Sequence, residues 1–371
     1  MNIRKSISLF SGAGGMDIGI KKAGFSVLAE LEIDKYCCQT LRAAVEREGT
    51  DTRVIEADIR TIDPSSIFDM FSLKPEELDL LFGGPPCQPF SLAGKQNGLD
   101  DSRGPLLFEI IRFAECLKPK VILLEQVKGL LSAKNQDGDK NGVFKQFLSE
   151  LTRIGYIPKW KVCLAADYGV PQLRERVFVV ATRAHNGFVF PEHTHVPQSE
   201  SLNLFNNPSY VTVGEALFGL GSPMPKTQGT TFQNCEDSHV DVTPPRDRER
   251  ISYVPEGSYL AAQLHVSTDI RGNLSKKDTT KYLRLDRNKP SNTLRCGEIF
   301  YHPVENRYLT PREYMRIHGY DDNYKLYGPV RSRTGSVKDL DQHRQVANSV
   351  PPPLAYVMGS KIWGYLDEQN I

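Results

Sequence analysis

Short apolar runs recur along the first half of the chain, and most of them end in glycine, proline or a charged residue. Runs of roughly four to eight residues with such breaks are typical of buried strands. The strand–helix rhythm that results predicts an α/β fold on a doubly wound sheet. The expected strands are residues 7–10, 27–34, 54–59, 78–82, 121–127, 159–165 and 177–180.

From about residue 185 this rhythm stops, and proline, serine, asparagine and threonine become frequent. We therefore expect two domains, which 371 residues can accommodate. Residues 1–184, completed by the C-terminal segment 338–371, are predicted to form the first domain. Residues 185–337 are predicted to form a smaller, loop-rich second domain.

Composition narrows the classes of function. The net charge is +1, so any nucleic-acid footprint must be local. No apolar run approaches the roughly 18 residues of a membrane span, and the first residues lead into a strand, not a signal peptide. Seven cysteines without a CxxC pair argue against a disulfide framework and a zinc site, so no metal is expected. A reducing cytoplasm fits best.

A glycine turn follows the first expected strand. Ser11-Gly12-Ala13-Gly14-Gly15 precedes a helix expected over residues 16–24. Strand, glycine turn and helix make the nucleotide-binding start of a doubly wound sheet. Asp17 takes the place of the third glycine of GxGxxG, which disfavours a dinucleotide oxidoreductase. From the glycines alone, a plain tight turn is an equal alternative.

Two acidic residues close the next two expected strands. Glu32 comes roughly 20 residues after the glycine turn, where a carboxylate can bind ribose hydroxyls. Asp58 ends the third expected strand. A lone surface carboxylate is usually only solvated, but two of them beside a glycine turn indicate a cofactor site.

One cysteine follows an unusual break in the chain. The apolar residues 78–82 lead into Gly83-Gly84-Pro85-Pro86-Cys87-Gln88-Pro89-Phe90-Ser91, and Gly94-Lys95-Gln96 and Asp101-Ser102-Arg103-Gly104 come after it. This block resembles the catalytic loop of the DNA (cytosine-5) methyltransferases. Residues 10–15 resemble the S-adenosylmethionine loop of that family, residues 172–176 its Gln-x-Arg-x-Arg motif, and residues 344–351 its Gly-Asn-Ser/Ala-Val-Pro motif.

The resemblance implies a Rossmann-like, S-adenosylmethionine-dependent methyltransferase domain and a small target-recognition domain. Its recognition segment is expected at about residues 185–290. The catalytic residues implied are Cys87, Glu125, Arg174 and Arg176. The residues implied to bind S-adenosylmethionine, released as S-adenosylhomocysteine, are Phe10, Ser11, Gly12, Ala13, Gly14, Gly15, Glu32, Ile33, Asp58, Ile59, Pro85, Leu106, Asn348, Ser349 and Val350. DNA contacts are expected at Gln88, Ser91, Lys95, Arg103, Lys276, Lys277 and Thr293.

The chain departs from the family pattern at two positions. Gln126 replaces the asparagine of the Glu-Asn-Val motif, which leaves the positioning role of that residue open. Ala347 replaces a glycine, and alanine is strained there if the position needs a positive φ. Arg174 and Arg176, at i and i+2, are expected to face the same way on a strand or extended turn.

Basic residues gather between positions 271 and 295. Arg271, Lys276, Lys277, Lys281, Arg284, Arg287, Lys289 and Arg295 stand against Asp278 and Asp286 alone. Eight minus two gives a local excess of +6. Such a run is usually a solvated face, but beside these motifs it indicates a surface that contacts DNA phosphates.

The residues also suit the chemistry. A Cys87 thiolate that adds at carbon 6 of cytosine makes carbon 5 nucleophilic toward a sulfonium methyl group. Glu125 can supply an acid near ring nitrogen 3, and an arginine can favour the thiolate or hold the carbonyl oxygen of the base. The base must first leave the duplex stack.

We therefore expect an enzyme of the bacterial restriction–modification type or of a related phage-defence system. Its partner is double-stranded DNA, and a monomer is expected, with no membrane and no stably bound restriction endonuclease or defence protein. It is expected in the cytoplasm, associated with the nucleoid when bound to DNA. A tRNA cytosine-5 methyltransferase and a catalytically silent DNA-binding scaffold are the alternatives.

Overall fold

The structure, a computed structural model, describes residues 3–86, 104–135, 137–183, 187–200, 207–225, 238–275, 278–330 and 340–370. The chain forms two compact units. Unit 1 comprises Met1–Leu164, Glu175–Glu192 and Pro352–Ile371, and unit 2 comprises Ala165–Arg174 and His193–Pro351. Residues 165–174 and 340–351, assigned by the sequence to the first domain, thus lie in unit 2. The functional domain boundaries stay a prediction.

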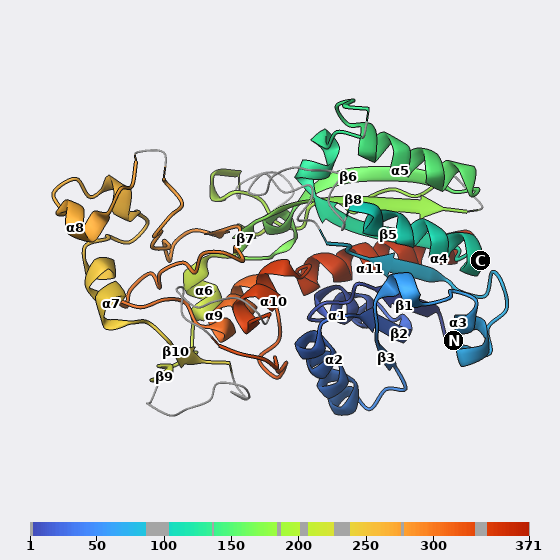
Figure 1. The fold of residues 1–371 in the computed structure, drawn as a ribbon, viewed down its shortest axis with the longest axis horizontal. Coiled ribbons are helices and arrows are strands. Elements are labelled where there is room, and N and C mark those ends of the chain that lie inside the picture. Colours follow the sequence, from blue (N-terminus) through green and yellow to red (C-terminus); the bar gives the residue numbers. More distant parts are fainter. Residues whose placement is uncertain are drawn as a thin grey trace. The chain divides into compact units, whose positions relative to one another are not determined.

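A seven-stranded sheet in the order β3-β2-β1-β4-β5-β8-β6 forms the centre of unit 1 (Figure 1). Neighbours from β3 to β5 pair in parallel, whereas β8 runs antiparallel to both β5 and β6. The carboxyl ends of the five parallel strands therefore share one edge. The strands are β1 Lys5–Leu9, β2 Ser26–Glu32, β3 Arg53–Glu56, β4 Leu80–Gly83, β5 Val121–Val127, β6 Ile157–Leu164 and β8 Glu175–Thr182.

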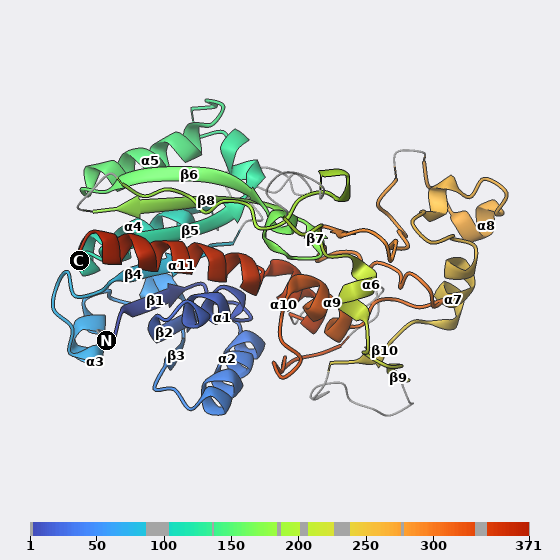
Figure 2. The same cartoon turned by 180° about the vertical axis from the view of Figure 1, so that it is seen from behind.

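Helices cover both faces of this sheet. In Figure 1, α4 and α5 lie on the face toward the viewer, and Figure 2 shows α1 and α11 on the opposite face. The predicted α/β fold is confirmed. The helices of unit 1 are α1 Gly15–Lys22, α2 Lys35–Glu48, α3 Ser66–Phe71, α4 Glu109–Leu117, α5 Gly142–Arg153 and α11 Pro352–Glu368.

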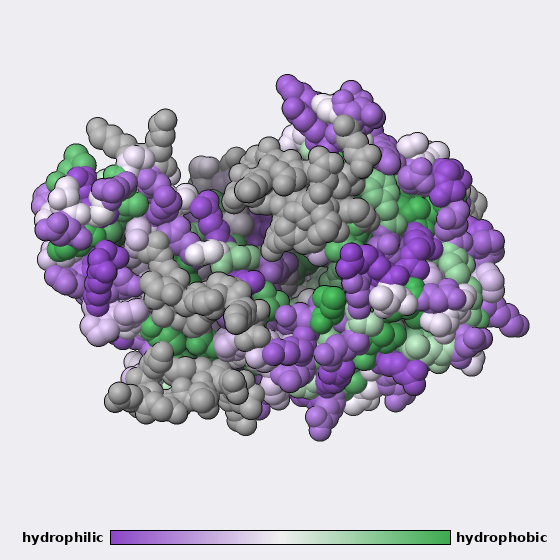
Figure 3. Space-filling view, in the orientation of Figure 1, coloured by the Kyte–Doolittle hydropathy of each residue, from purple (hydrophilic) through white to green (hydrophobic). Residues whose placement is uncertain are grey.

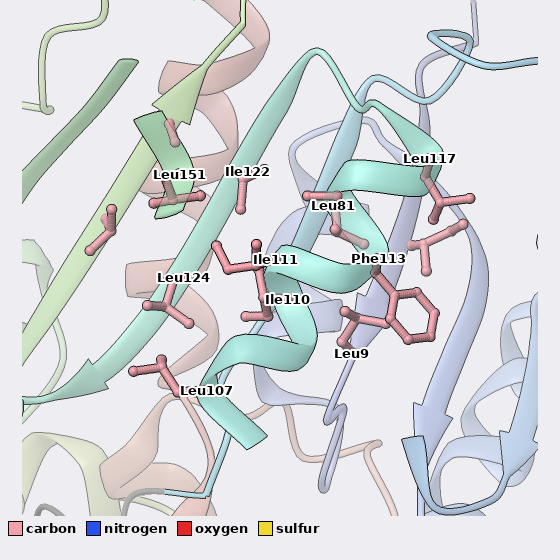
Figure 4. Close-up of a cluster of buried hydrophobic side chains, with 14 of the residues drawn as sticks. Leu9, Leu81, Leu107, Ile110, Ile111, Phe113, Leu117, Ile122, Leu124 and Leu151 are labelled. Carbon is pink, nitrogen blue, oxygen red and sulfur yellow. The ribbon is translucent and has the colours of Figure 1, made fainter. Parts of the chain in front are cut away.

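The main core lies between the sheet and α4. Ile110, Ile111, Phe113 and Leu117 project from one stripe of this helix toward apolar residues of β1, β4 and β5 (Figure 4). Each such side chain stabilises the fold by about 1.5–3 kcal/mol when fully buried. This core fixes the positions of the parallel strands. It therefore also fixes the sheet edge at which their carboxyl ends lie.

The C-terminal helix belongs to unit 1 because glycine lets it approach α1 closely. A Cβ added at Gly19 would lie 2.5 Å from the Ala355 Cβ and 2.5 Å from the Tyr356 nitrogen. Gly359 does the same from α11, where an added Cβ would lie 2.9 Å from the Ala23 Cβ. The last helix thus covers the helix that follows the glycine turn.

The ends of several expected elements differ from those observed, and two of these differences have a clear local cause. The third strand ends at Glu56, because Asp58 accepts the Arg60 N–H and caps a 3₁₀ turn over Ile59–Thr61. Pro105 suits the first position of a helix and predicts one that runs to about Leu117, but this segment begins as the 3₁₀ turn Gly104–Phe108 and becomes α-helical only at Glu109. Both differences lie at the ends of elements, where a local cap or turn competes with the regular structure.

Unit 2 has short elements joined by irregular segments. It contains a buried ion pair between Arg307 and Glu313, with nitrogen–oxygen distances of 2.7 and 2.8 Å. Thr310 and Glu313 form a reciprocal cap at the start of α9. The elements described are β7 Gln172–Leu173, α6 Val213–Leu217, β9 Met224–Pro225, β10 Val240–Asp241, α7 Pro245–Ser252, α8 Thr268–Arg271, β11 Ser291–Asn292, α9 Pro311–His318 and α10 Gln342–Asn348.

The surface of unit 1 seen in Figure 3 is mostly hydrophilic, and its hydrophobic residues form small separate patches. Among the helices that the structure describes, none combines the length and apolar character needed to cross a membrane.

Candidate active site

The glycine turn predicted after the first strand is strained and open. Phe10, Gly12 and Gly14 have φ values of 58°, 55° and 76°, in the left-handed region. For Phe10 this conformation costs roughly 1–2 kcal/mol, and such strain is often kept at ligand sites. No atom lies within 4 Å of the place where a Cβ of Gly12 would stand. The turn therefore leaves space beside its backbone.

Glu32 closes this turn from the end of β2. One carboxylate oxygen accepts the Gly12 N–H at 2.7 Å, and the other accepts the N–H groups of Ile33 and Asp34 at 2.8 and 2.9 Å. Burial raises the pKa of Glu32, and the three backbone N–H groups lower it in part. The carboxyl group is thus fixed between the turn and the end of its own strand.

The ends of β2 and β3 add an apolar side chain and a second acid. Ile33, which directly follows β2, is 63% exposed. Asp58 pairs with Arg60, whose hydrogen bonds hold the pKa of that carboxyl below its usual range. Arg112 of α4 donates to the Ile59 carbonyl at 2.7 Å and so ties the turn after Asp58 to α4. The predicted cofactor residues Phe10–Gly15, Glu32, Ile33, Asp58 and Ile59 therefore meet at one sheet edge.

Glu125 lies at the same edge, at the end of β5. Its Oε1 is 2.8 Å from the Arg176 Nε, and both side chains are nearly buried. A Cβ added at Gly84 would lie 3.2 Å from the Glu125 Oε2, so a glycine there leaves room for the carboxylate. Gly84 follows β4, the strand that leads to Cys87.

Gln126 holds the segment before Cys87. Its Nε2 donates to the Pro85 carbonyl at 3.0 Å, while its Oε1 accepts the Val127 N–H at 2.8 Å. The side chain is fully buried. Gln126 therefore makes a contact that can position Pro85, despite its departure from the family pattern. Pro85 is buried, and Leu106, also predicted at the cofactor, is half-buried against the main core.

Several predicted residues lie outside the part of the chain that the structure describes. Cys87 is the central one, and Pro86 is the last described residue before it. The others are Gln88, Ser91, Lys95, Arg103, Lys276 and Lys277.

Arg174 and Arg176 have different partners. Arg174 lies between β7 and β8 in unit 2, is 1% exposed, and donates through Nη2 to the carbonyls of Ala347 and Ser349 at 2.9 and 3.0 Å. Arg176 lies on β8 in unit 1 and pairs with Glu125. The expectation that both face the same way assumed one continuous extended segment, and that segment breaks at Arg174.

His318 was not predicted, yet it holds the same part of unit 2. Its ring nitrogens lie 3.0 Å from the Gln172 Nε2 and 3.0 Å from the Ser349 carbonyl. Because the carbonyl only accepts, Nε2 of this ring carries the hydrogen and Nδ1 accepts from Gln172. The available sequence signal was a histidine in the last turn of a helix that ends in a glycine, at Gly319.

The predicted segment Asn348–Val350 is anchored within unit 2. The Cys296 thiol donates to the Asn348 Oδ1 at 2.7 Å, and the Ser349 hydroxyl donates to the Val346 carbonyl at 2.8 Å. Ala347 is part of α10 and is absent from the residues with positive φ. Alanine is therefore unstrained at this position.

The basic segment carries less free charge than the local count of +6 suggests. Glu256, from outside the segment, pairs with Arg287, whereas the pairs of Lys281 with Asp278 and of Lys289 with Asp286 are already included in that count. Arg284 is buried and donates to backbone carbonyls, among them Val254 at 2.9 Å. The hydroxyl of Thr293, a predicted DNA contact, donates to the Leu173 carbonyl at 2.7 Å. Within the described ranges, no group of His, Cys, Asp and Glu is placed to hold a metal ion.

The strand order, the antiparallel β8 and the glycine turn at the carboxyl edge define the Rossmann-like fold of a methyltransferase. The chain matches the family described as C-5 cytosine-specific DNA methylase over residues 4–364, and it belongs to that family. It is therefore a DNA cytosine-5 methyltransferase, and the family predicted from its motifs is confirmed.

Known proteins agree with this assignment. The chain is 42% identical to the Type II methyltransferase M.AquIA of Picosynechococcus sp. over 60% of its own length and 91% of that protein. It is 34% identical to the Type II methyltransferase M.PspPI of Psychrobacter sp., over 96% of this chain and 78% of the relative. These relatives place the chain with enzymes of the restriction–modification type.

A solved structure supports the fold. It is described as a DNA modification methyltransferase encoded within a prophage of E. coli, and it matches with a TM-score of 0.70 at 23% identity. The match covers 98% of this chain and 99% of that one.

Proposed function

We propose that this enzyme methylates carbon 5 of a cytosine within a specific duplex DNA sequence, with S-adenosylmethionine as the methyl donor. The target base is flipped out of the helix and attacked by Cys87. The observation that carries the proposal is the Glu125–Arg176 ion pair, which lies beside Gly84 where the chain leaves β4 and continues to Cys87.

The residues of the sheet edge suit S-adenosylmethionine. Gly12 leaves the backbone open to a ligand, Gly12 and Gly14 both adopt the positive φ of the turn, and Glu32 offers a carboxylate for ribose hydroxyls. Ile33 is an exposed apolar surface for an adenine ring, with Asp58 and Ile59 at the next strand end. Pro85, Leu106 and residues 348–350 are proposed to complete the pocket. The cofactor supplies an electrophilic methyl group.

The chain's own residues prepare the cytosine. The Cys87 thiolate forms a bond to carbon 6, and the ring electrons that this addition displaces make carbon 5 nucleophilic. Glu125 shares a proton with ring nitrogen 3, while Arg176 orients the carboxyl group and balances its charge. After carbon 5 has gained the methyl group, it loses its proton to a base, and the Cys87 thiolate leaves as the ring double bond re-forms.

Arg174 is proposed to act differently from Arg176. Its guanidinium is buried among carbonyls of unit 2, so it positions residues 347–349 and does not touch the base. Specificity is proposed to reside in residues 185–290, with DNA contacts from Gln88, Ser91, Lys95, Arg103, Lys276 and Lys277. The Thr293 hydroxyl donates to a backbone carbonyl of unit 2, so we propose that Thr293 supports the DNA-binding surface without contacting DNA itself.

The biological role proposed is protection of host DNA, in the cytoplasm, within a restriction–modification or related phage-defence system. The names of the Type II relatives support the first of these settings. The catalytically silent scaffold is disfavoured because Glu125, Arg176 and Cys87 are all present.

The test is bisulfite sequencing of DNA from cells that express the protein, with a Cys87→Ser variant as control. We expect a single cytosine within one short sequence to resist conversion by bisulfite, because it is methylated at carbon 5. In cells that express the control variant, this cytosine should be converted. Purified protein is then assayed on duplex DNA and on tRNA. Methylation of tRNA alone would establish the alternative substrate, and methylation of neither would contradict the proposal.

A further inference from the structure

Unit 1 buries an acid that the proposed mechanism does not use. Asp17 is the third residue of α1, directly after the glycine turn, and is 1% exposed. Neither of its carboxyl oxygens has a partner at ordinary hydrogen-bond geometry among the described residues, although the Ser8 hydroxyl lies near enough to favour the charged form. An ionised carboxylate in such a place is unfavourable unless it is paired, so its protonation state needs an explanation.

The surrounding charges indicate where a proton is held. Glu30 of β2 is fully buried, and its Oε1 is 2.8 Å from the Lys21 Nζ, which also lies 3.2 Å from the Glu48 Oε2. Lys21 and Arg47, whose Nη2 lies 3.0 Å from the Glu48 Oε1, thus serve three acids, and three minus two leaves one excess negative charge if all ionise. Because Lys21 contacts Glu30 and Glu48 directly, Asp17 is the acid left to take a proton.

The pKa values point the same way. Burial, followed by the charge of Glu30, raises the pKa of Asp17 to about 8, against the opposing effects of Ser8 and Lys21. Glu48 of α2 acts on Glu30 and Lys21. The helix α11 packs on α1 through Pro352, Ala355 and Tyr356, and its charged residues, at 361, 367 and 368, are not among the groups that shift Asp17.

Asp17 is connected to the glycine turn through two serines. The Ser8 hydroxyl, which acts on Asp17 from β1, accepts a buried hydrogen bond from the Ser11 hydroxyl at 2.8 Å. Ser11 is the first residue of the turn, and its carbonyl accepts the Gly14 N–H at 3.0 Å. Ionised Asp17 would need water or Lys21, and either would disturb the first turn of α1, which carries Gly15.

We propose that Asp17, kept in its protonated form, is a positioning residue that sets the glycine turn for S-adenosylmethionine, so that binding weakens as this carboxyl ionises. This rests on the proposed function, which assigns the turn to that cofactor. Asparagine has the shape of the protonated acid and cannot ionise, so Asp17→Asn should preserve binding and remove its pH dependence.

The experiment is calorimetry of the full chain with S-adenosylmethionine from about pH 6 to about pH 10. For the wild type, affinity should fall roughly tenfold per pH unit above about 8. Asp17→Asn should bind as the wild type does at neutral pH and stay constant above it. The exposed Asp51→Asn is the matched control and should keep the wild-type profile.

An unchanged alkaline loss of affinity in Asp17→Asn would overturn this inference alone. Absence of binding by the wild type at every pH would overturn the cofactor assignment and the inference with it.

The stability of the folded protein is measured over the same pH range. The pKa of Asp17 is higher in the folded chain than the ordinary 3.8, so its contribution to stability is fully present below that value and declines as pH rises to about 8, because only the unfolded chain loses the proton in this range. Wild-type stability should therefore fall relative to Asp17→Asn across this range, and parallel curves would contradict the buried proton.

Discussion

At the residue scale, the site depends on side chains that are held before any substrate arrives. Arg176 fixes Glu125 on one side, and Gly84 leaves space for the carboxylate on the other. Gln126 fixes the Pro85 carbonyl two residues before Cys87. Catalysis in this account relies on such preorganisation, since a small misplacement of a reacting group is costly.

Glu125→Gln should reduce the single-turnover methylation rate by about 10² to 10⁴-fold, because an amide of similar shape cannot share a proton with the base. Glu115→Gln is the matched control. Glu115 also pairs with an arginine, Arg153, but its side chain is 55% exposed and belongs to no proposed site. A Glu125→Gln rate within a few-fold of the wild-type rate would exclude the proposed role.

Gln126→Ala should leave the buried Pro85 carbonyl without its donor. We expect a loss of about 1–3 kcal/mol in the free energy of unfolding and slower methylation, measured by urea titration and initial rates. Gln146→Ala, at an exposed position of α5 outside every proposed site, serves as control and should change neither quantity. If Gln126→Ala keeps both stability and rate, the hydrogen bond to Pro85 has no positioning role.

At the element scale, the close packing of α1 on α11 fixes the position of α1, the helix that directly follows the glycine turn. Gly19 has backbone atoms of α11 on the side where a Cβ would lie, whereas Gly364 of the same α11 has open space there. The two glycines therefore have opposite structural roles within one pair of helices.

Gly19→Ala should destabilise the protein by about 1–3 kcal/mol or more, because the backbone of α11 must move. Gly364→Ala, the matched control, should stabilise it by about 0.5–1 kcal/mol, because alanine favours a helix and meets no neighbour. Thermal unfolding of both variants measures this. Equal effects of the two substitutions would show that α11 does not pack on α1 as described.

Elements with a strong local signal were predictable. The buried strand 121–127 is observed as β5 over Val121–Val127, and the glycine turn lies between β1 and α1 as expected. Element ends were less so, because the cap made by Asp58 ends β3 early. The partners of Arg174 were not predictable, since Ala347 and Ser349 lie more than 170 residues away along the chain.

At the scale of the whole molecule, a charge count over a short segment of the sequence predicts poorly how much charge is available to contact DNA. Acids distant in sequence pair with the basic segment, as Glu256 does with Arg287 from 31 residues away. By contrast, the family and the class of reaction followed from motifs in a fixed order, which the match over residues 4–364 confirms.

Replacing both Lys276 and Lys277 by alanine should weaken binding to all duplex sequences alike and reduce its dependence on salt, because each phosphate contact releases counterions. Lys289→Ala is the control, since Lys289 pairs with Asp286. Binding is measured on specific and unrelated duplexes over a range of salt. A change in which sequence is methylated would instead make these lysines readers of the bases.

The most direct test of the central claim uses duplex DNA with 5-fluorocytosine at the target cytosine, incubated with the enzyme and S-adenosylmethionine. Fluorine cannot leave carbon 5 as a proton does, so the bond between Cys87 and carbon 6 should persist. We expect a complex that survives denaturing electrophoresis, and none with Cys87→Ser. If the wild type methylates ordinary duplex DNA yet is not trapped, or if Cys87→Ser is trapped as well, Cys87 is not the nucleophile.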